Sequence, residues 1–184
     1  PDRNRLMNLA ADYLTAGGFT EIMSNSLTKE SYYEGLTSYP AARCVRILNP
    51  LSADLNVMRQ TLLFNTMEAV QLNANRRNGN LRLYEFGNCY FYDEAARDAE
   101  KPLSAYSEQY RLAIAVTGAA VPQSWNAKPQ ASSFFTLRAV AEKLLRRFGL
   151  DIYALKCEPL QSDLFGDGIS LSAGNGRELL QMGC

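Results

Sequence analysis

The stretch from Leu81 to Tyr92 constrains the fold of this chain more than any other. Its letters, LRLYEFGNCYFY, are rich in aromatic residues and contain no proline, which is typical of a long β-strand. Alternation divides its side chains into two sets, with Tyr84, Phe86, Tyr90 and Tyr92 on one face and Leu83, Cys89 and Phe91 on the other. Because both faces are apolar, both need cover. We therefore interpret the aromatic stripe as core, in a sheet with helices packed on it.

Three helices are predicted around this strand. Apolar residues spaced i, i+3, i+4 and i+7 predict the first, Asn4–Ala16, and Gly17-Gly18 is a suitable stop. Thr61 is a suitable N-cap for the second helix, which would run through Arg77. Its inward face is expected to hold Leu63, Met67 and Val70.

The third helix is expected to begin after Ser133 and to end at Gly149. Leu137, Ala141, Leu144 and Phe148 lie along one side of it. Glu142 and Arg146 have the i,i+4 order that favours an ion pair.

Further strands are predicted at Phe19–Leu27, Cys44–Leu48, Arg111–Gly118 and Ile152–Glu158, with Lys29–Glu34 as a helical turn and Asp93–Ser107 as a loop. The small alternate residues of Arg111–Gly118 favour a central strand. At the end of the chain, Asn175-Gly176 predicts a hairpin with a type I′ turn. That hairpin would pair Ile169 with Met182 and Leu171 with Leu180. The order of elements predicts one α+β domain over residues 1–184, with a largely antiparallel sheet flanked by helices.

The composition excludes several classes of site. The chain has no histidine, which removes serine-histidine and cysteine-histidine catalysis and an imidazole metal ligand. Its four cysteines form no CxxC pair, so we expect reduced thiols and neither a metal site nor a disulfide framework. Nineteen basic and nineteen acidic residues give zero net charge, which predicts weak binding to nucleic acid.

Other features of the sequence bear on where the chain works. No apolar run approaches the roughly 20 residues that cross a bilayer. We therefore expect a cytoplasmic protein with no membrane contact. Because the chain opens on Pro1 and ends at Cys184 straight after a predicted strand, we also expect a domain cut from a longer polypeptide.

Glu85 is the carboxylate that most needs an explanation. Alternation places it on the same face as Leu83 and Phe91, where an unpaired charge is costly. Arg59 is the candidate partner for a structural ion pair, an interpretation that we prefer to a catalytic one. The pair Arg76-Arg77 could contact phosphate, but cations are favoured near a helix C-terminus whatever their function.

Three stretches together resemble one known family. They are NPLSADLNVMRQTLL at 49–63, LRLYEFGNCYF at 81–91 and SSFFTLRAVAEKLL at 132–145. They resemble the catalytic-like core domain of the bacterial phenylalanyl-tRNA synthetase β subunit, and the resemblance covers nearly the whole chain. It implies a class II aminoacyl-tRNA synthetase-like fold inside an (αβ)2 enzyme.

The resemblance also implies different roles for the two subunits. In this family the α subunit carries the active site for ATP, magnesium and phenylalanine, and the β domain is a silent copy that supports the assembly. The implied partners are the α subunit and, through the whole enzyme, tRNA(Phe). The first helix and the strand after it look like the motif that class II enzymes use for subunit contact. Its interface candidates here are Leu6, Leu9, Tyr13 and Leu14.

The residues depart from a working class II site. Such a site resembles an arginine two residues before a glutamate, whereas Arg82 and Glu85 are three apart and so point to opposite faces of a strand. The glycine-rich third motif has no counterpart, so we expect no catalytic, cofactor-binding or metal-binding residue in this domain. Two alternatives stay open: a stand-alone RNA-binding module using Arg76, Arg77 and the strand aromatics, and a self-sufficient adenylate-forming ligase-like enzyme.

Overall fold

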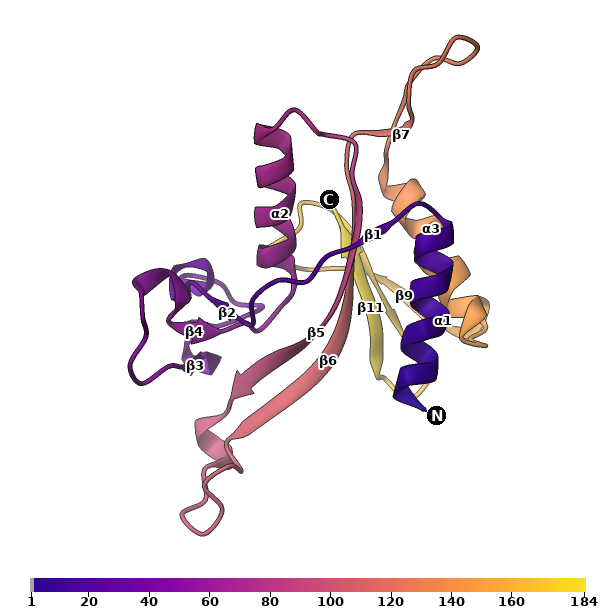
Figure 1. Cartoon of the computed structure of the whole chain (residues 1–184). Coiled ribbons are helices and arrows are strands. Elements are labelled where there is room, and N and C mark those ends of the chain that lie inside the picture. Colours follow the sequence, from indigo (N-terminus) through magenta and orange to yellow (C-terminus); the bar gives the residue numbers. More distant parts are fainter. Residues whose placement is uncertain (1) are drawn as a thin grey trace. The chain divides into compact units, whose positions relative to one another are not determined.

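The computed structural model describes residues 2–184, and the chain divides into two compact units (Figure 1). The first unit contains residues up to Thr20, Gly79–Arg82 and Ala115–Cys184. The second contains Glu21–Asn78 and Leu83–Ile114. Together they form an α+β fold with three α-helices and several small, mostly antiparallel sheets, which confirms the predicted fold class. The assignment of residues 1–184 to a single domain stays a prediction.

In the first unit, α1 (Arg3–Ala16) packs against α3 (Phe134–Arg147) (Figure 1). The carboxylate of Asp2 caps α1 by accepting from the Asn4 N–H at 2.9 Å. As predicted, Ser133 caps α3, and with Thr136 it forms a capping box. Gly149, at φ +81°, follows the end of α3, also as predicted.

Two details after α3 differ from prediction. Glu142 pairs with Arg138 at 2.7 Å rather than with Arg146, whose guanidinium donates to the Tyr153 hydroxyl instead. The segment predicted as a strand from Ile152 begins with a 3₁₀ turn, η5 (Ile152–Ala154), and only then becomes β9 (Lys156–Pro159). The turn forms because the Asp151 carboxylate accepts from the Tyr153 N–H, which favours a local turn over the sheet.

The terminal hairpin joins β10 (Gly168–Ser172) to β11 (Glu178–Gly183), and with β9 they form an antiparallel sheet of order β11-β10-β9. The predicted pairs Ile169–Met182 and Leu171–Leu180 are confirmed. The turn type was wrong: Ala173 N–H donates to Arg177 O and Gly176 N–H to Ala173 O, which encloses three residues. Only Gly176, at φ +79°, has a positive φ in this turn, whereas a type I′ turn needs two such residues. A second short ribbon, β7 (Ala119–Val121) with β8 (Gln130–Ala131), completes the first unit.

Most of the long strand β5 (Arg82–Tyr92) belongs to the second unit. The boundary between the units falls inside β5 and also inside β1 (Thr20–Glu21) and β6 (Tyr106–Val116). These strands form a sheet of order β1-β5-β6. A smaller antiparallel sheet has order β2-β4-β3, with β2 at Leu27–Thr28, β4 at Val57–Met58 and β3 at Val45–Arg46. Single 3₁₀ turns lie between these elements: η1 (Glu30–Tyr33), η2 (Ala41–Arg43), η3 (Ala53–Leu55) and η4 (Glu94–Ala96).

The long strand was predicted well, but its neighbours were not. In β5 the odd-numbered residues from Leu83 to Phe91 are all buried, as alternation required. However, β6 begins at Tyr106, five residues before the predicted start, and lies at the edge of its sheet rather than in the centre. The predicted strand Phe19–Leu27 is interrupted because Ser24 bonds to a side chain, Glu85, and not to a neighbouring strand. The predicted strand Cys44–Leu48 shrinks to β3.

Helix α2 (Leu63–Asn75) buries a different face from the one predicted. Its buried residues are Asn65 and Thr66, whereas Met67 is 43% exposed. Asn65 Nδ2 donates to Asn25 O, and the Thr66 hydroxyl donates to Leu62 O, so both buried donors find an acceptor inside the protein. The N-cap position belongs to Leu62, although the Thr61 hydroxyl still accepts from the Leu63 N–H.

None of the helices in residues 2–184 has the length and apolar character that crossing a bilayer requires.

The hairpin turn yields a first test. Gly176→Ala should lower the free energy of unfolding by about 1–2 kcal/mol, because φ +79° is strained for any residue with a Cβ. Gly174→Ala is the matched control: it lies in the same turn, has no positive φ and has open space around it. Urea unfolding measures both. Equal effects of the two substitutions would contradict the glycine bulge.

Candidate functional site

The second unit contains a buried ion pair between Arg59 and Glu85. Arg59 Nη1 lies 2.8 Å from Glu85 Oε1, and the side chains are 4% and 1% exposed. Arg59 follows β4 directly, and Glu85 lies in the middle of β5, so backbone hydrogen bonds fix both residues near each other. The structure thus brings together the two residues that the sequence nominated as partners.

Further partners bond to both charged groups. Ser24 donates to the Glu85 carboxylate through its N–H at 3.2 Å and through its hydroxyl at 2.8 and 2.7 Å. Arg59 donates from Nε to Asn88 O at 3.0 Å and from Nη1 to Asn25 O at 3.4 Å. A buried charge pair is tolerable only with such additional hydrogen bonds, and here they come from two segments, Ser24-Asn25 and Asn88 of β5.

Gly87 makes room for the arginine. A Cβ built on Gly87 would lie 2.1 Å from Arg59 Nη2 and 2.9 Å from Leu62 Cδ2. Real Cβ atoms do not come this close to other atoms, so only glycine lets the guanidinium approach the strand this closely at this position. Sequence reasoning named neither Gly87 nor Ser24. A glycine in the interior of a strand is itself a sign of close approach, and this signal could have found Gly87.

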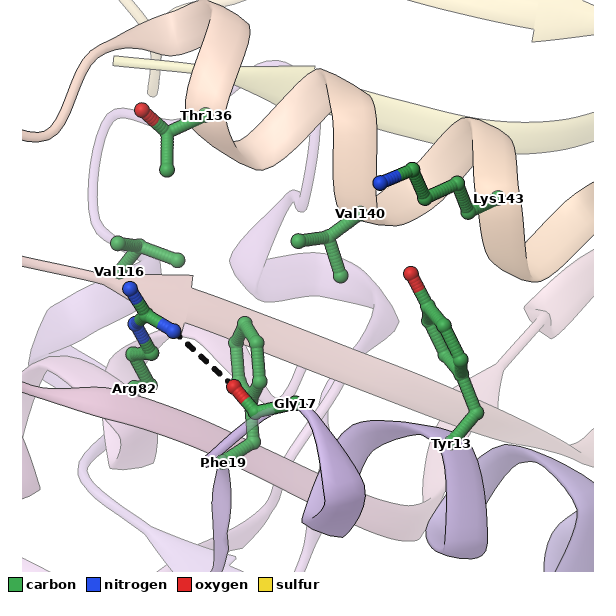
Figure 2. Close-up of a pocket in the computed structure, with 8 residues that line it drawn as sticks. All are labelled: Tyr13, Gly17, Phe19, Arg82, Val116, Thr136, Val140 and Lys143. Carbon is green, nitrogen blue, oxygen red and sulfur yellow. Dashed lines mark hydrogen bonds between the residues drawn. The ribbon is translucent and has the colours of Figure 1, made fainter. Parts of the chain in front are cut away.

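Arg82 belongs to the first unit and is committed to the backbone. Its Nη1 donates to Gly17 O at 3.0 Å and its Nη2 to Ala120 O at 2.9 Å. Figure 2 shows the first of these bonds in the wall of a cavity of about 250 Å³. The lining residues are Tyr13, Gly17, Phe19, Arg82, Val116, Thr136, Val140 and Lys143. The cavity is mostly apolar and smaller than the roughly 300–1,000 Å³ of typical small-molecule sites.

Both arginines therefore have partners inside the protein. A nucleotide site, by contrast, needs cationic groups that are free to donate to phosphate. Arg59 is buried and faces a carboxylate, and Arg82 donates to two carbonyl oxygens. Binding a phosphate at either would break these bonds and, at Arg59, leave a buried carboxylate unpaired, at a cost of several kcal/mol. In residues 2–184 no group of three or more acidic or cysteine side chains could hold a metal ion.

The interface candidates on α1 differ in exposure. Leu6 is 38% exposed, Leu9 and Tyr13 are half-buried, and Leu14 is fully buried. Leu14 thus packs inside the chain and has no surface to offer a partner, while Tyr13 lines the cavity of Figure 2. An apolar stripe alone does not separate residues that face the chain's own core from those that face outward.

The other residues considered from the sequence lie outside the ion pair and the cavity. Arg76 and Arg77 are exposed where α2 ends, and Arg77 has a left-handed backbone at φ +62°. Of the aromatic stripe, Tyr84 is buried, whereas Phe86, Tyr90 and Tyr92 are half-buried. Cys44 and Cys89 are buried free thiols, and burial raises the pKa of each.

The chain is similar to several known proteins. Residues 1–173 match the family described as the phenylalanyl tRNA synthetase beta chain CLM domain. The chain belongs to this family. Phenylalanine–tRNA ligase beta subunits from Bacteroides thetaiotaomicron and Bacteroides fragilis are 46% and 44% identical over 180 residues. The subunit from Porphyromonas gingivalis is 40% identical over 177 residues.

These relatives are much longer proteins. The aligned region covers 98% of this chain but only 22% of the Bacteroides subunits, so the CLM chain spans about a fifth of their length. Its fold is also similar to that of a pyrrolysyl-tRNA synthetase from Desulfitobacterium hafniense, with a TM-score of 0.64 at 16% identity. That match covers 98% of this chain and 58% of the other, and it confirms a class II aminoacyl-tRNA synthetase-like fold.

Removing one member of the ion pair should be costly. Glu85→Gln leaves Arg59 buried without a counter-charge, so the free energy of unfolding should fall by about 3 kcal/mol or more. Arg59→Met should cost a comparable amount. The double variant, which buries neither charge, should lose clearly less than the two single losses combined. Urea unfolding of all four proteins measures the coupling, and strict additivity would show that the pair has no energetic link.

The close approach at Gly87 gives a separate prediction. Gly87→Ala should destabilise the protein by about 1–3 kcal/mol, because its methyl group displaces the Arg59 guanidinium. Gly79→Ala is the control, since Gly79 has no atom within 4 Å of a built Cβ. In an Arg59→Met background the cost of Gly87→Ala should shrink. Thermal unfolding followed by circular dichroism measures the loss of stability in both backgrounds. An equal loss with and without Arg59 would contradict the role of the arginine.

Proposed function

We propose that this CLM chain is a non-catalytic supporting domain of a phenylalanine–tRNA ligase β subunit and packs against the α subunit. The α subunit would then bind ATP, magnesium and phenylalanine, and tRNA(Phe) would engage the whole enzyme in the cytoplasm. One observation carries the proposal: the arginines of the strand region, Arg59 and Arg82, have intramolecular partners and are not free to bind a nucleotide.

The two alternative functions find less support. A self-sufficient adenylate-forming enzyme needs cationic groups free to hold ATP phosphates, and Arg59 and Arg82 are not free. A stand-alone RNA-binding module would use Arg76 and Arg77, yet the net charge of the chain is zero. The exposed part of α1 fits a subunit contact better, because Leu6 presents apolar surface there.

Association with the α subunit tests the proposal. Leu6→Asp should weaken binding of the chain to purified α subunit by at least tenfold, or about 1.4 kcal/mol, because it buries a charge in an apolar contact. The melting temperature of the isolated Leu6→Asp chain should barely change, since Leu6 is 38% exposed. Asn8→Asp, which adds the same charge at an exposed polar position of α1, is the control.

A second measurement addresses catalysis directly. The chain alone should give no ATP–pyrophosphate exchange with phenylalanine, whereas the α and β subunits together should. Exchange by the chain alone would overturn the non-catalytic assignment. Absence of binding to the α subunit, with the fold intact, would overturn the supporting role.

A further inference from the structure

Two arginines of the second unit share one aromatic ring. The Cζ atom of Arg43 lies 5.2 Å from the ring centroid of Phe91, and that of Arg111 lies 5.3 Å from the same centroid. Phe91 is only 5% exposed and belongs to a core cluster with Leu62 and Cys89. The ring is therefore a fixed platform, and both guanidiniums are held beside it by cation–π attraction.

The two cations are not neutralised by the protein. Among residues 2–184, neither Arg43 nor Arg111 forms an ion pair with a carboxylate. Arg111 donates to neutral acceptors instead, the Tyr39 hydroxyl at 3.2 Å and Gln109 Oε1 at 2.8 Å. Elsewhere in the unit, by contrast, Arg46 and Arg59 each have a glutamate partner.

The polar groups around the ring are arranged as donors. The Tyr39 hydroxyl accepts from Arg111, which leaves its own O–H free to donate. Arg43 ends the short turn η2, where its backbone N–H donates to Pro40 O at 2.9 Å, and its side chain is exposed. With no ion pair to break, its guanidinium can turn toward an anion at the ring edge.

We propose that Arg43, Arg111 and Tyr39, placed around Phe91, form a binding site for a phosphate dianion. Two planar guanidinium forks match the oxygens of a phosphate in geometry, and their two charges match its two negative charges. The ligand is inorganic phosphate or the terminal phosphomonoester of a nucleotide or of an RNA 5′ end. A phosphodiester in a chain backbone carries one charge and fits less well. This site is separate from Arg59 and Arg82 and does not depend on the proposed supporting role.

Titration of the full chain tests the site. The nitrogen-bound proton signals of the Arg43 and Arg111 side chains are followed by NMR while inorganic phosphate, AMP or adenosine is added. Phosphate and AMP should shift both signals saturably, and adenosine should not. The affinity should rise between pH 5.5 and pH 7.5, because a phosphomonoester loses its second proton near pH 6.

Variants separate this site from general basic surface. Arg43→Ala and Arg111→Ala should each weaken phosphate binding about tenfold or more, and the lysine variants should fall between. Arg76→Ala, which removes an exposed arginine at the end of α2, should leave binding unchanged. Circular dichroism checks the fold. If Arg111→Ala does not fold, Arg111→Lys serves in its place.

The source of the phosphate is resolved by a last comparison. A short RNA with a 5′-phosphate should bind more tightly than the same RNA with a 5′-hydroxyl, and the difference should vanish in Arg43→Ala. Equal binding of the two RNAs would overturn the preference for a dianion. Absence of saturable shifts with phosphate, or an equal loss in Arg76→Ala, would overturn the site itself.

Discussion

The contact between Arg59 and Glu85 organises the second unit. It joins the residue that follows β4 to the middle of β5, and Ser24 and Asn25 close it from the segment between β1 and β2. Such a pair contributes little stability relative to an apolar core of the same volume, but its hydrogen bonds connect β4, β5 and the segment before β2. The interrupted strand before Leu27, the glycine in β5 and the buried start of α2 are all consistent with that arrangement.

The pair also shows how the arginines of a synthetase-like fold can be engaged inside the protein. In this chain the strand region keeps its arginines but gives each a partner inside the protein. Arg59 is neutralised by a carboxylate, and Arg82 ties the end of α1 to β7 through two carbonyl oxygens. Both guanidiniums therefore connect separate segments of the chain.

Patterns in the sequence predicted those features that depend on local chemistry. Alternation in β5 placed Glu85 in the core, the apolar register fixed the terminal hairpin, and Ser133 and Gly149 marked the ends of α3. The failures came where hydrogen bonds replace hydrophobic burial. Asn65 and Thr66 are buried on α2 because their donor groups find backbone oxygen acceptors there. The spacing of apolar residues does not predict this. The true turn differs from the predicted one because it encloses three residues, of which only Gly176 has a positive φ.

Ser24 shows a further limit, because its role exists only once Arg59 and Glu85 are in place. It occupies an ordinary strand-like stretch with no local sign of a buried partner. The exposure of Leu6 against the burial of Leu14 is a similar case, since both occupy one helical stripe. Spatial partners from distant segments decide such roles, and a linear pattern does not contain them.

The fit between Gly87 and the arginine side chain limits how these two positions can change. A larger residue at position 87 displaces the guanidinium, and a shorter residue at position 59 leaves Glu85 buried without a counter-charge. Either change alone therefore destabilises the strand region. A substitution at one of these positions is expected to be tolerated best when its neighbours in the contact change with it.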